Sequence, residues 1–327
     1  MTAADATRPA LGGMSPPAAA LALPDGPRST LLGPDLRPTP EWRARLRRIP
    51  AGRNALAVAS VWAQAGLVVG AAVRLGHPAA YAAAFLLMGR THAQLLSLMH
   101  EAAHRLLFPS RRVNDWVGRW LVGYPTLTNV DGYRRVHMAH HREEFGPDEP
   151  DVPLYAHYPI PRASFARKML RDATGVTGMR MLRDQLRGLR SPVPLVRDSQ
   201  VRIVAVQAGM WAACAAAGVW WVWPLLWLGP YLTVWRVINR LRSIAEHGGL
   251  RADADRRATT HSVRQGRLAR LALVPYGIGW HMAHHLDPGL PFRALPRYHA
   301  ELRASGAVSD ALEWPSYRAC WRALSAG

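Results

Sequence analysis

The chain of 327 residues has few of the residues on which several protein classes depend. It contains two cysteines, Cys214 and Cys320, which are far apart in the sequence. Two such residues cannot form a disulfide framework or a cysteine-based zinc site. The sequence also lacks a dinucleotide-binding fingerprint, a cysteine cluster and a haem-attachment motif.

Lysine is nearly absent, because Lys168 is the only lysine among 41 lysine and arginine residues, which leaves 40 arginines. The formal net charge of +19 could suggest a nucleic-acid partner. A nucleic-acid surface, however, presents a basic stripe with interleaved aromatic residues. The arginines here flank apolar runs instead, so we expect no nucleic-acid partner.

The first 40 residues lack any apolar periodicity and are rich in alanine, proline, glycine and aspartate. That composition predicts a disordered segment over residues 1–40. No charged start followed by an apolar stretch and a cleavage site is visible, so we expect no signal peptide.

Long apolar runs occur in two pairs, at residues 55–75 and 79–99 and at residues 202–219 and 222–238. Each run is about as long as a membrane span, and tryptophans at 220, 221 and 223 mark the second turn. The alternative is a pair of buried helical hairpins in a soluble protein. We predict an all-α integral membrane protein with four transmembrane helices in two hairpins.

Arginine is distributed unevenly around these runs. It precedes the first run and follows the second and fourth, at positions 43, 45, 47, 48, 53, 105, 111, 112, 240 and 242. Only Arg74 lies near a turn, so the positive-inside rule places both termini in the cytoplasm. Arg90 lies inside the second run, where a charge is costly. It either lines a substrate path, pairs with a carboxylate such as Glu101 or Glu246, or lies beyond the end of a membrane span that is shorter than the apolar run.

Eight of the 14 histidines stand in three short strings. The strings are His100 and His104; His137, His140 and His141; and His281, His284 and His285. Spacings of three or four residues put the imidazoles of a string on one helix face, where they can reach one metal ion. His247 is a ninth candidate. Nine imidazoles exceed the needs of one zinc ion, and two ions with open positions favour iron over magnesium or calcium.

These strings, in this order around two apolar hairpins, resemble the membrane fatty acid desaturase family, which also contains alkyl and lipid hydroxylases. The resemblance covers roughly residues 50–300 and includes five further stretches, at residues 114–118, 133–136, 149–151, 245–247 and 281–299. Many relatives have Glu or Gln where this chain has Ala283. Alanine cannot donate or accept a side-chain hydrogen bond, so the neighbouring ligands must be oriented from elsewhere.

The resemblance implies nine iron ligands: His100, His104, His137, His140, His141, His247, His281, His284 and His285. It implies two iron ions, held in a cytoplasmic helical cap. The desaturase-like domain would cover residues 41–300, and residues 301–327 would form a cytoplasmic tail. Glu101 and Glu246 are the carboxylates expected to assist beside the ligands. The implied reaction uses O2 and two external electrons on an acyl or alkyl chain, at the cytoplasmic membrane. The electron donor would be a ferredoxin or a reductase.

Other interpretations remain open. The reaction could be hydroxylation instead of desaturation, because both begin with the same hydrogen abstraction. His100, Glu101 and His104 also match the zinc-protease pattern HExxH, with Asp287 as a distal ligand, but six of the eight histidines in the strings are then unused. Asp115, Asp131, Asp151, Glu246 and Asp287 could hold imidazole N–H groups. We expect structural roles for His77, His92, His157, His261 and His299.

Overall fold

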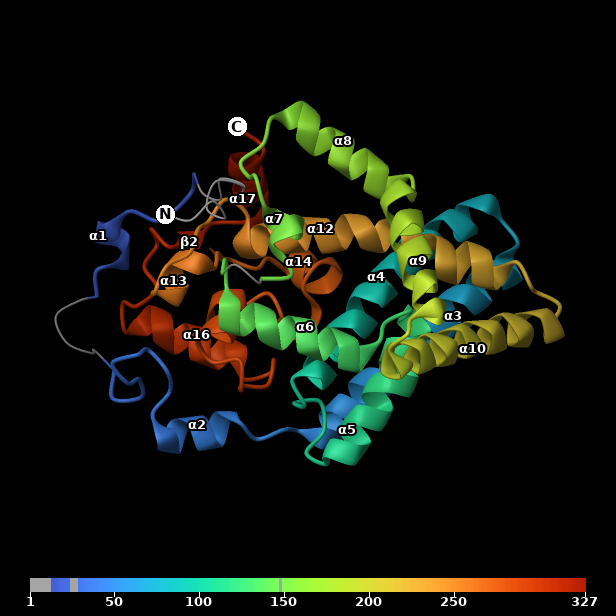
Figure 1. Cartoon of the computed structure of the whole chain (residues 1–327), viewed down its shortest axis with the longest axis horizontal. Coiled ribbons are helices and arrows are strands. Elements are labelled where there is room, and N and C mark those ends of the chain that lie inside the picture. The colour runs from blue at the N-terminus through green and yellow to red at the C-terminus, as the bar shows by residue number, and fades with distance from the viewer. Residues whose placement is uncertain (1–12, 24–28, 147–148) are drawn as a thin grey trace.

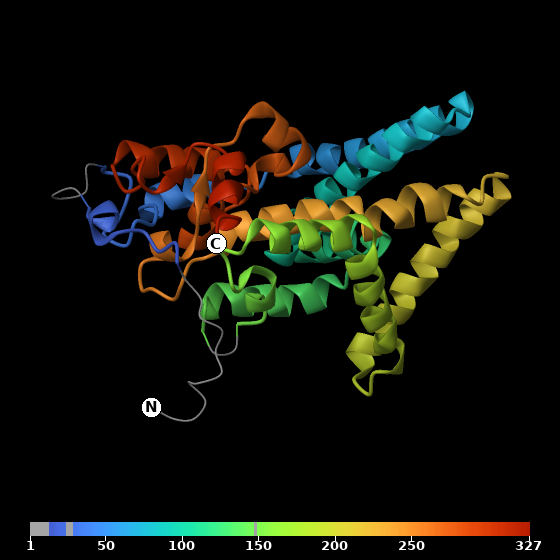
Figure 2. The same cartoon turned by 90° about the horizontal axis from the view of Figure 1, so that it is seen from above.

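The computed structural model describes residues 13–23, 29–146 and 149–327, and this part of the chain is mostly helical. Its two strands, β1 (Ser262–Val263) and β2 (Glu313–Trp314), form one short parallel pair. The all-α prediction is therefore confirmed. Figures 1 and 2 show a helical body from which two helical hairpins extend in roughly the same direction.

The first hairpin joins α3 (Ala51–Leu75) to α4 (Pro78–Ala103), and it contains both predicted apolar runs. Gly76 ends α3 in the left-handed conformation (φ 62°), which costs glycine little. Pro78 then opens α4, where its missing N–H has no helical partner to lose. Of the described residues, one helical stretch, Pro40–Leu75, is long and apolar enough to cross a membrane.

The second hairpin differs from the two continuous runs predicted at 202–219 and 222–238. Helix α10 (Pro194–Ala216) begins earlier, and the returning segment is divided into η5 (Trp223–Leu228), α11 (Gly229–Leu232) and α12 (Val234–His247). Pro224 and Pro230 lack the backbone N–H of a regular α-helix, which explains the interruption. The four-span topology therefore stays a prediction.

Most of the remaining helices form the body around the end of α4. The remaining helices are α1 (Ala18–Leu21), α2 (Pro40–Leu46), α5 (Arg111–Val117), η2 (Gly118–Gly123), η3 (Tyr124–Thr126), α6 (Val130–Glu143), α7 (Val152–Tyr155), α8 (Arg162–Ala173), α9 (Val176–Arg187), η4 (Gly188–Arg190), α13 (Arg256–Thr259), α14 (Arg267–Ala272), η6 (Pro275–Gly277), α15 (His281–Leu286), α16 (Leu295–Ala304) and α17 (Tyr317–Leu324). Of these, α9 and η4 extend from the body beside α10 (Figure 2). Both α6 and α12 contact α4, so three histidine-bearing helices meet.

The chain ends contribute to this body, in contrast to the predicted disordered segment and tail. Residues 1–12 and 24–28 lie outside the described residues, but Leu32 is buried in the core and Ser29 Oγ donates to Glu301 Oε1 (2.5 Å). Helix α17 buries Tyr317 and Leu324 in a cluster with Ile244 of α12. Apolar residues at helical spacing in α17 explain why the last residues form part of the body.

Candidate metal centre

The first histidine string lies at the end of α4, which the following loop fixes. The buried Asn114 side chain donates to Ala102 O (2.9 Å) and accepts from the backbone N–H groups of Leu107 (3.1 Å) and Phe108 (3.3 Å). It thereby satisfies a carbonyl that the helix end leaves free. His100 and His104 are presented on one face of this fixed helix end.

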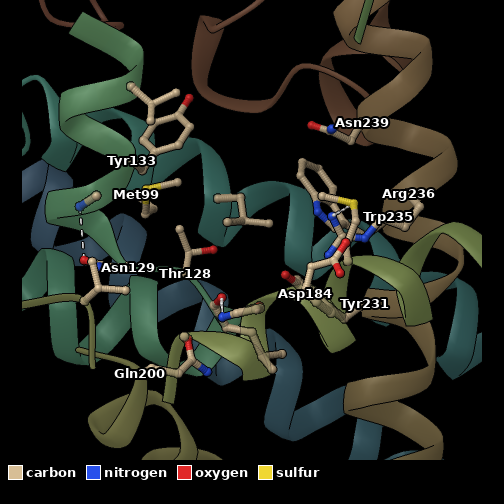
Figure 3. Close-up of a pocket in the computed structure, with 18 of the residues that line it drawn as sticks. Met99, Thr128, Asn129, Tyr133, Asp184, Gln200, Tyr231, Trp235, Arg236 and Asn239 are labelled. Carbon is tan, nitrogen blue, oxygen red and sulfur yellow. Dashed lines mark hydrogen bonds between the residues drawn. The ribbon is translucent and has the colours of Figure 1, made fainter. Parts of the chain in front are cut away.

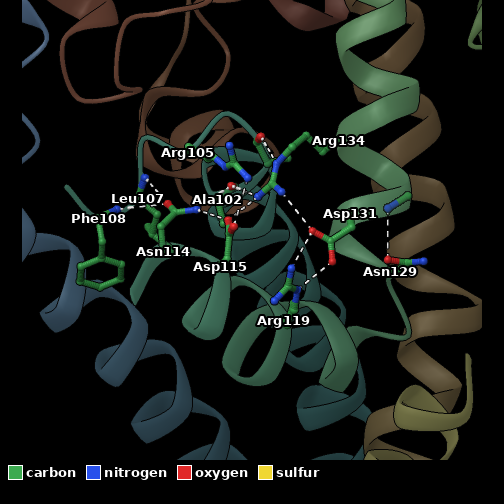
Figure 4. Close-up of polar contacts among 12 residues, drawn as sticks. Ala102, Arg105, Leu107, Phe108, Asn114, Asp115, Arg119, Asn129, Asp131 and Arg134 are labelled. Carbon is green, nitrogen blue, oxygen red and sulfur yellow. Dashed lines mark hydrogen bonds and ion pairs between the residues drawn. The ribbon is translucent and has the colours of Figure 1, made fainter. Parts of the chain in front are cut away.

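An arginine network joins α4 to the helix of the second string. Arg134 of α6 donates to Ala103 O (2.8 Å) and Ala102 O (3.1 Å), and it pairs with Asp115 (2.6 Å) and Asp131 (3.0 Å) (Figure 4). The predicted supporting residues Asp115 and Asp131 thus hold an arginine and not an imidazole. Their contribution is the relative position of α4 and α6.

All nine predicted histidines converge in the body of the protein. Four-residue groups form from His100, His104, His137 and His284, and from His140, His247, His281 and His285. In each group the candidate ligand atoms lie within 4.8 Å of one another. His141 lies between the groups, with its ring centre 4.5 Å from that of His137 and 4.3 Å from that of His285. The arrangement could hold two metal ions.

Several ring nitrogens show why metal fits this site. His104, His284 and His285 each bury an Nε2 atom that has no hydrogen-bond partner among the described residues. The Nε2 atoms of His281 and His247 lie 2.8 Å apart, and those of His141 and His137 lie 3.1 Å apart. A buried nitrogen without a partner is costly, by about 1–3 kcal/mol. Metal ions would satisfy several of these nitrogens at once.

The protonation state of the site also suits metal binding. Burial lowers the pKa of His104 to about 3, and it lowers the pKa of His284 and His285 well below the usual range. These imidazoles are therefore neutral at neutral pH, which is the form that binds a metal.

Two carboxylates contact candidate metal ligands of the second group. Glu149 Oε1 lies 2.5 Å from His140 Nδ1, and Glu144 contacts His285 Nδ1 while also pairing with Arg256. Burial opposes the charge on His140, but the hydrogen bond and charge of Glu149 outweigh burial and raise the pKa of His140. The sequence prediction assigned no role to either glutamate. The proximity of Glu144 to the second string and the Glu149-Pro-Asp motif were the available signals.

The two predicted assisting carboxylates have different positions. Glu246 Oε1 accepts from Arg242 Nε (2.8 Å) and lies 3.6 Å from His281 Nδ1, beside the site. Glu101 is buried and accepts from the backbone N–H of Phe292 (3.0 Å), so it fixes the loop that follows the third string. Neither metal-ligand group includes Glu101, and this position does not favour the protease interpretation.

The other predicted residues divide between site and scaffold. Asp151 lies in a group with His140 and Glu149, whereas Asp287 pairs with Arg43 (2.5 Å). Ala283 is buried and has no side-chain group that could orient a neighbouring histidine. Glu144 contacts His285 and orients its ring instead. Arg90 donates to Leu271 O (2.8 Å) and Gln64 Oε1 (2.9 Å) and pairs with neither Glu101 nor Glu246 in the described part of the chain.

The five histidines with expected structural roles lie outside both groups. His77 accepts from Ala79 N at the start of α4, and His92 contacts Trp227 O (2.9 Å). His261 contacts Gly248 O (2.7 Å), and His299 contacts Glu313 (2.9 Å). His157 has a left-handed backbone (φ 68°).

Two cavities meet at the site. The smaller, of about 130 Å³, is lined by histidines of both groups together with Asp151 and Glu246. The larger, of about 670 Å³, lies between α4, α6, α9, α10 and α12. Tyr133, Asn239 and Arg242 line both cavities, so the larger cavity lies next to the smaller one that the histidines line.

The histidine groups and the helical hairpins agree with the sequence comparisons. The profile of the fatty acid desaturase family matches residues 76–317, and the chain belongs to this family. It is therefore an oxidoreductase of the desaturase type, in a family of membrane-associated proteins. Among curated proteins, it is 25% identical over 251 residues to dihydrorhizobitoxine desaturase of Bradyrhizobium elkanii, with 72% of this chain and 71% of the relative covered.

Proposed function

We propose that this protein is a di-iron enzyme that uses O2 and two external electrons to introduce a C=C bond into an acyl or alkyl chain. The observation that carries the proposal is the pair of four-histidine groups with His141 between them. Ligand sets made of imidazole nitrogens with open positions suit iron, and two ions account for nine ligands. Bound iron would supply the O2 activation and electron transfer that side chains cannot.

The chain itself contributes position and shielding. Glu149 and Glu144 hold His140 and His285 in fixed ring orientations through their Nδ1 atoms. His247 is held in the same way by Thr259 O (2.8 Å). The buried surroundings of the histidines would keep water from the reacting carbon. The larger cavity, which shares Tyr133, Asn239 and Arg242 with the smaller one, would hold the chain.

The balanced reaction explains the proposed partners. Removing two hydrogens from a –CH2–CH2– unit with O2, two electrons and two protons gives the alkene and two molecules of water. The chain has no flavin or cysteine-cluster motif, so we propose a separate ferredoxin or reductase as electron donor. We propose no nucleic-acid partner.

A measurement of the reaction products tests both the substrate class and the choice between desaturation and hydroxylation. The relative is named as a desaturase, which supports loss of two hydrogens over hydroxylation, and it is named for dihydrorhizobitoxine and not for a fatty acid. We expect mass spectrometry of cells expressing the wild-type protein to show products lighter by two hydrogens, and these products to be absent with His140→Ala. Products heavier by one oxygen would establish the hydroxylase, and cleaved membrane peptides with unchanged lipids would contradict both.

We further propose that the protein spans the cytoplasmic membrane four times with both termini in the cytoplasm. The arginine asymmetry and the apolar outer face of α3, where Leu67 is 73% exposed, support this topology. In a background without Cys214 and Cys320, we expect an impermeant thiol reagent applied from outside to label His77→Cys. It should not label Ala163→Cys or Asp310→Cys until the membrane is opened. External labelling at position 163 would contradict the topology.

A further inference from the structure

The larger cavity contains a buried arginine whose charge is not matched by an acid. Arg236 of α12 is 8% exposed and lines this cavity (Figure 3). Among the described residues it forms no ion pair; its Nη1 contacts only the thioether of Met181 (3.4 Å), and its Nε has no partner. A thioether is a weak acceptor, and a buried charge without a counter-charge is costly.

The nearby groups do not compensate for this charge. The guanidinium lies 4.3 Å from the ring centre of Tyr231, a favourable but small cation–π contact. Asp184 lines the same cavity, yet its side chain is 54% exposed and pairs with Arg187. Asp172 pairs with Arg240. The counter-charge of Arg236 is therefore absent from the described part of the chain.

The opposite wall of the cavity offers a second unpartnered donor. Gln200 of α10 is 6% exposed, and its Nε2 has no hydrogen-bond partner in the described residues. It lies across the cavity from Arg236 in Figure 3. Apolar side chains, among them Leu96, Met99 and Val136, complete the lining. Such a lining suits an amphipathic molecule better than a plain hydrocarbon.

We propose, on the basis of the proposed function, that Arg236 binds the carboxylate of an amphipathic acid substrate. A guanidinium presents two parallel N–H donors that match a carboxylate. Arg236 and the ligand His247 are 11 positions apart on α12, which is about 16 Å along the helix. Asn239 and Arg242, which line both cavities, lie between them. The reacting carbon is therefore remote from the carboxylate, and the substrate enters as a free acid.

The test measures binding independently of turnover. Dodecanoate, its methyl ester and dodecyl phosphate would displace a fluorescent fatty acid from the iron-loaded protein in nanodiscs. We expect Arg236→Gln to raise the Kd of dodecanoate by about 10- to 100-fold, because a charge-assisted hydrogen bond is lost. The Kd of the methyl ester should not change. Arg236→Lys, which keeps the charge but not the paired donors, should give a smaller increase.

Arg183→Gln is the matched control, because it removes an exposed arginine from α9 that does not line the cavity. Unchanged iron content in each variant shows that the fold is intact. The proposal would be overturned if the wild-type protein bound dodecanoate and its methyl ester with equal affinity, or if Arg236→Gln weakened the binding of both equally. Tighter binding of dodecyl phosphate than of dodecanoate would overturn the carboxylate assignment in favour of a phosphate. If Arg236→Gln binds dodecanoate normally while iron and products persist, this inference fails and the proposed function stands. A wild-type protein that binds no iron and yields no oxidised product would overturn the proposed function, even if it binds dodecanoate more tightly than the methyl ester.

Discussion

Alanine at His104 or at His285 is expected to abolish activity and to remove most of the bound iron. His104 belongs to one four-histidine group and His285 to the other, and each has a buried Nε2 atom without a hydrogen-bond partner among the described residues, which leaves that atom available to a metal ion. Iron analysis of the purified wild-type protein should give close to two ions per chain, with less in each variant. Activity should fall below detection, because a centre that lacks one ion cannot complete the reaction.

His77→Ala is the control for these variants. His77 accepts from Ala79 N at the start of α4, far along the helix from the ligands, so its loss costs a helix cap worth about 1 kcal/mol. Iron content and activity should be retained. One zinc ion per wild-type chain, together with an active His285→Ala protein, would contradict the di-iron assignment.

The sequence predicted the parts of this centre that depend on local spacing. Histidines three or four residues apart lie on one helix face wherever the helix is placed, so His100 with His104 and His137 with His141 could be paired from spacing alone. The first hairpin was equally predictable from the sequence, because Gly76 and Pro78 separate two uniform apolar runs. Spacing alone left His247 as a single candidate, and the family resemblance gave it its role, because its partners His140, His281 and His285 all stand more than 30 positions away in the chain.

Contacts between distant segments could not be read from spacing. Glu144 contacts His285 across 141 positions, and only the folded structure reveals this contact. Glu101 looked like an assisting group because it neighbours His100, yet helical rotation turns it toward Phe292. Pro224 and Pro230 in the returning helical segment of the second hairpin are visible in the sequence, but the prediction of one continuous span gave more weight to the apolar composition.

Removal of the carboxylates that orient His140 and His285 is expected to weaken iron binding without removing any ligand. In Glu149→Ala, His140 loses its Nδ1 partner, so its ring orientation and tautomer are no longer fixed. Glu144→Ala has the same effect on His285 and also frees Arg256. Partners of this kind typically contribute 10- to 100-fold in metal affinity, so we expect a loss of about that size in each variant. Competition with a chelator of known affinity would measure it.

Glu143→Ala is the matched control, since Glu143 adjoins Glu144 in the chain but pairs only with Arg142 at the surface among the described residues. It removes the same charge from the same helix end and should leave iron affinity unchanged. Glu149→Gln should lie between wild type and Glu149→Ala, because the amide oxygen can still accept from Nδ1 while the charge that raises the pKa of His140 is gone. Equal losses in Glu143→Ala and Glu144→Ala would mean that general charge at this helix end, and not the contact with His285, sets the affinity for iron.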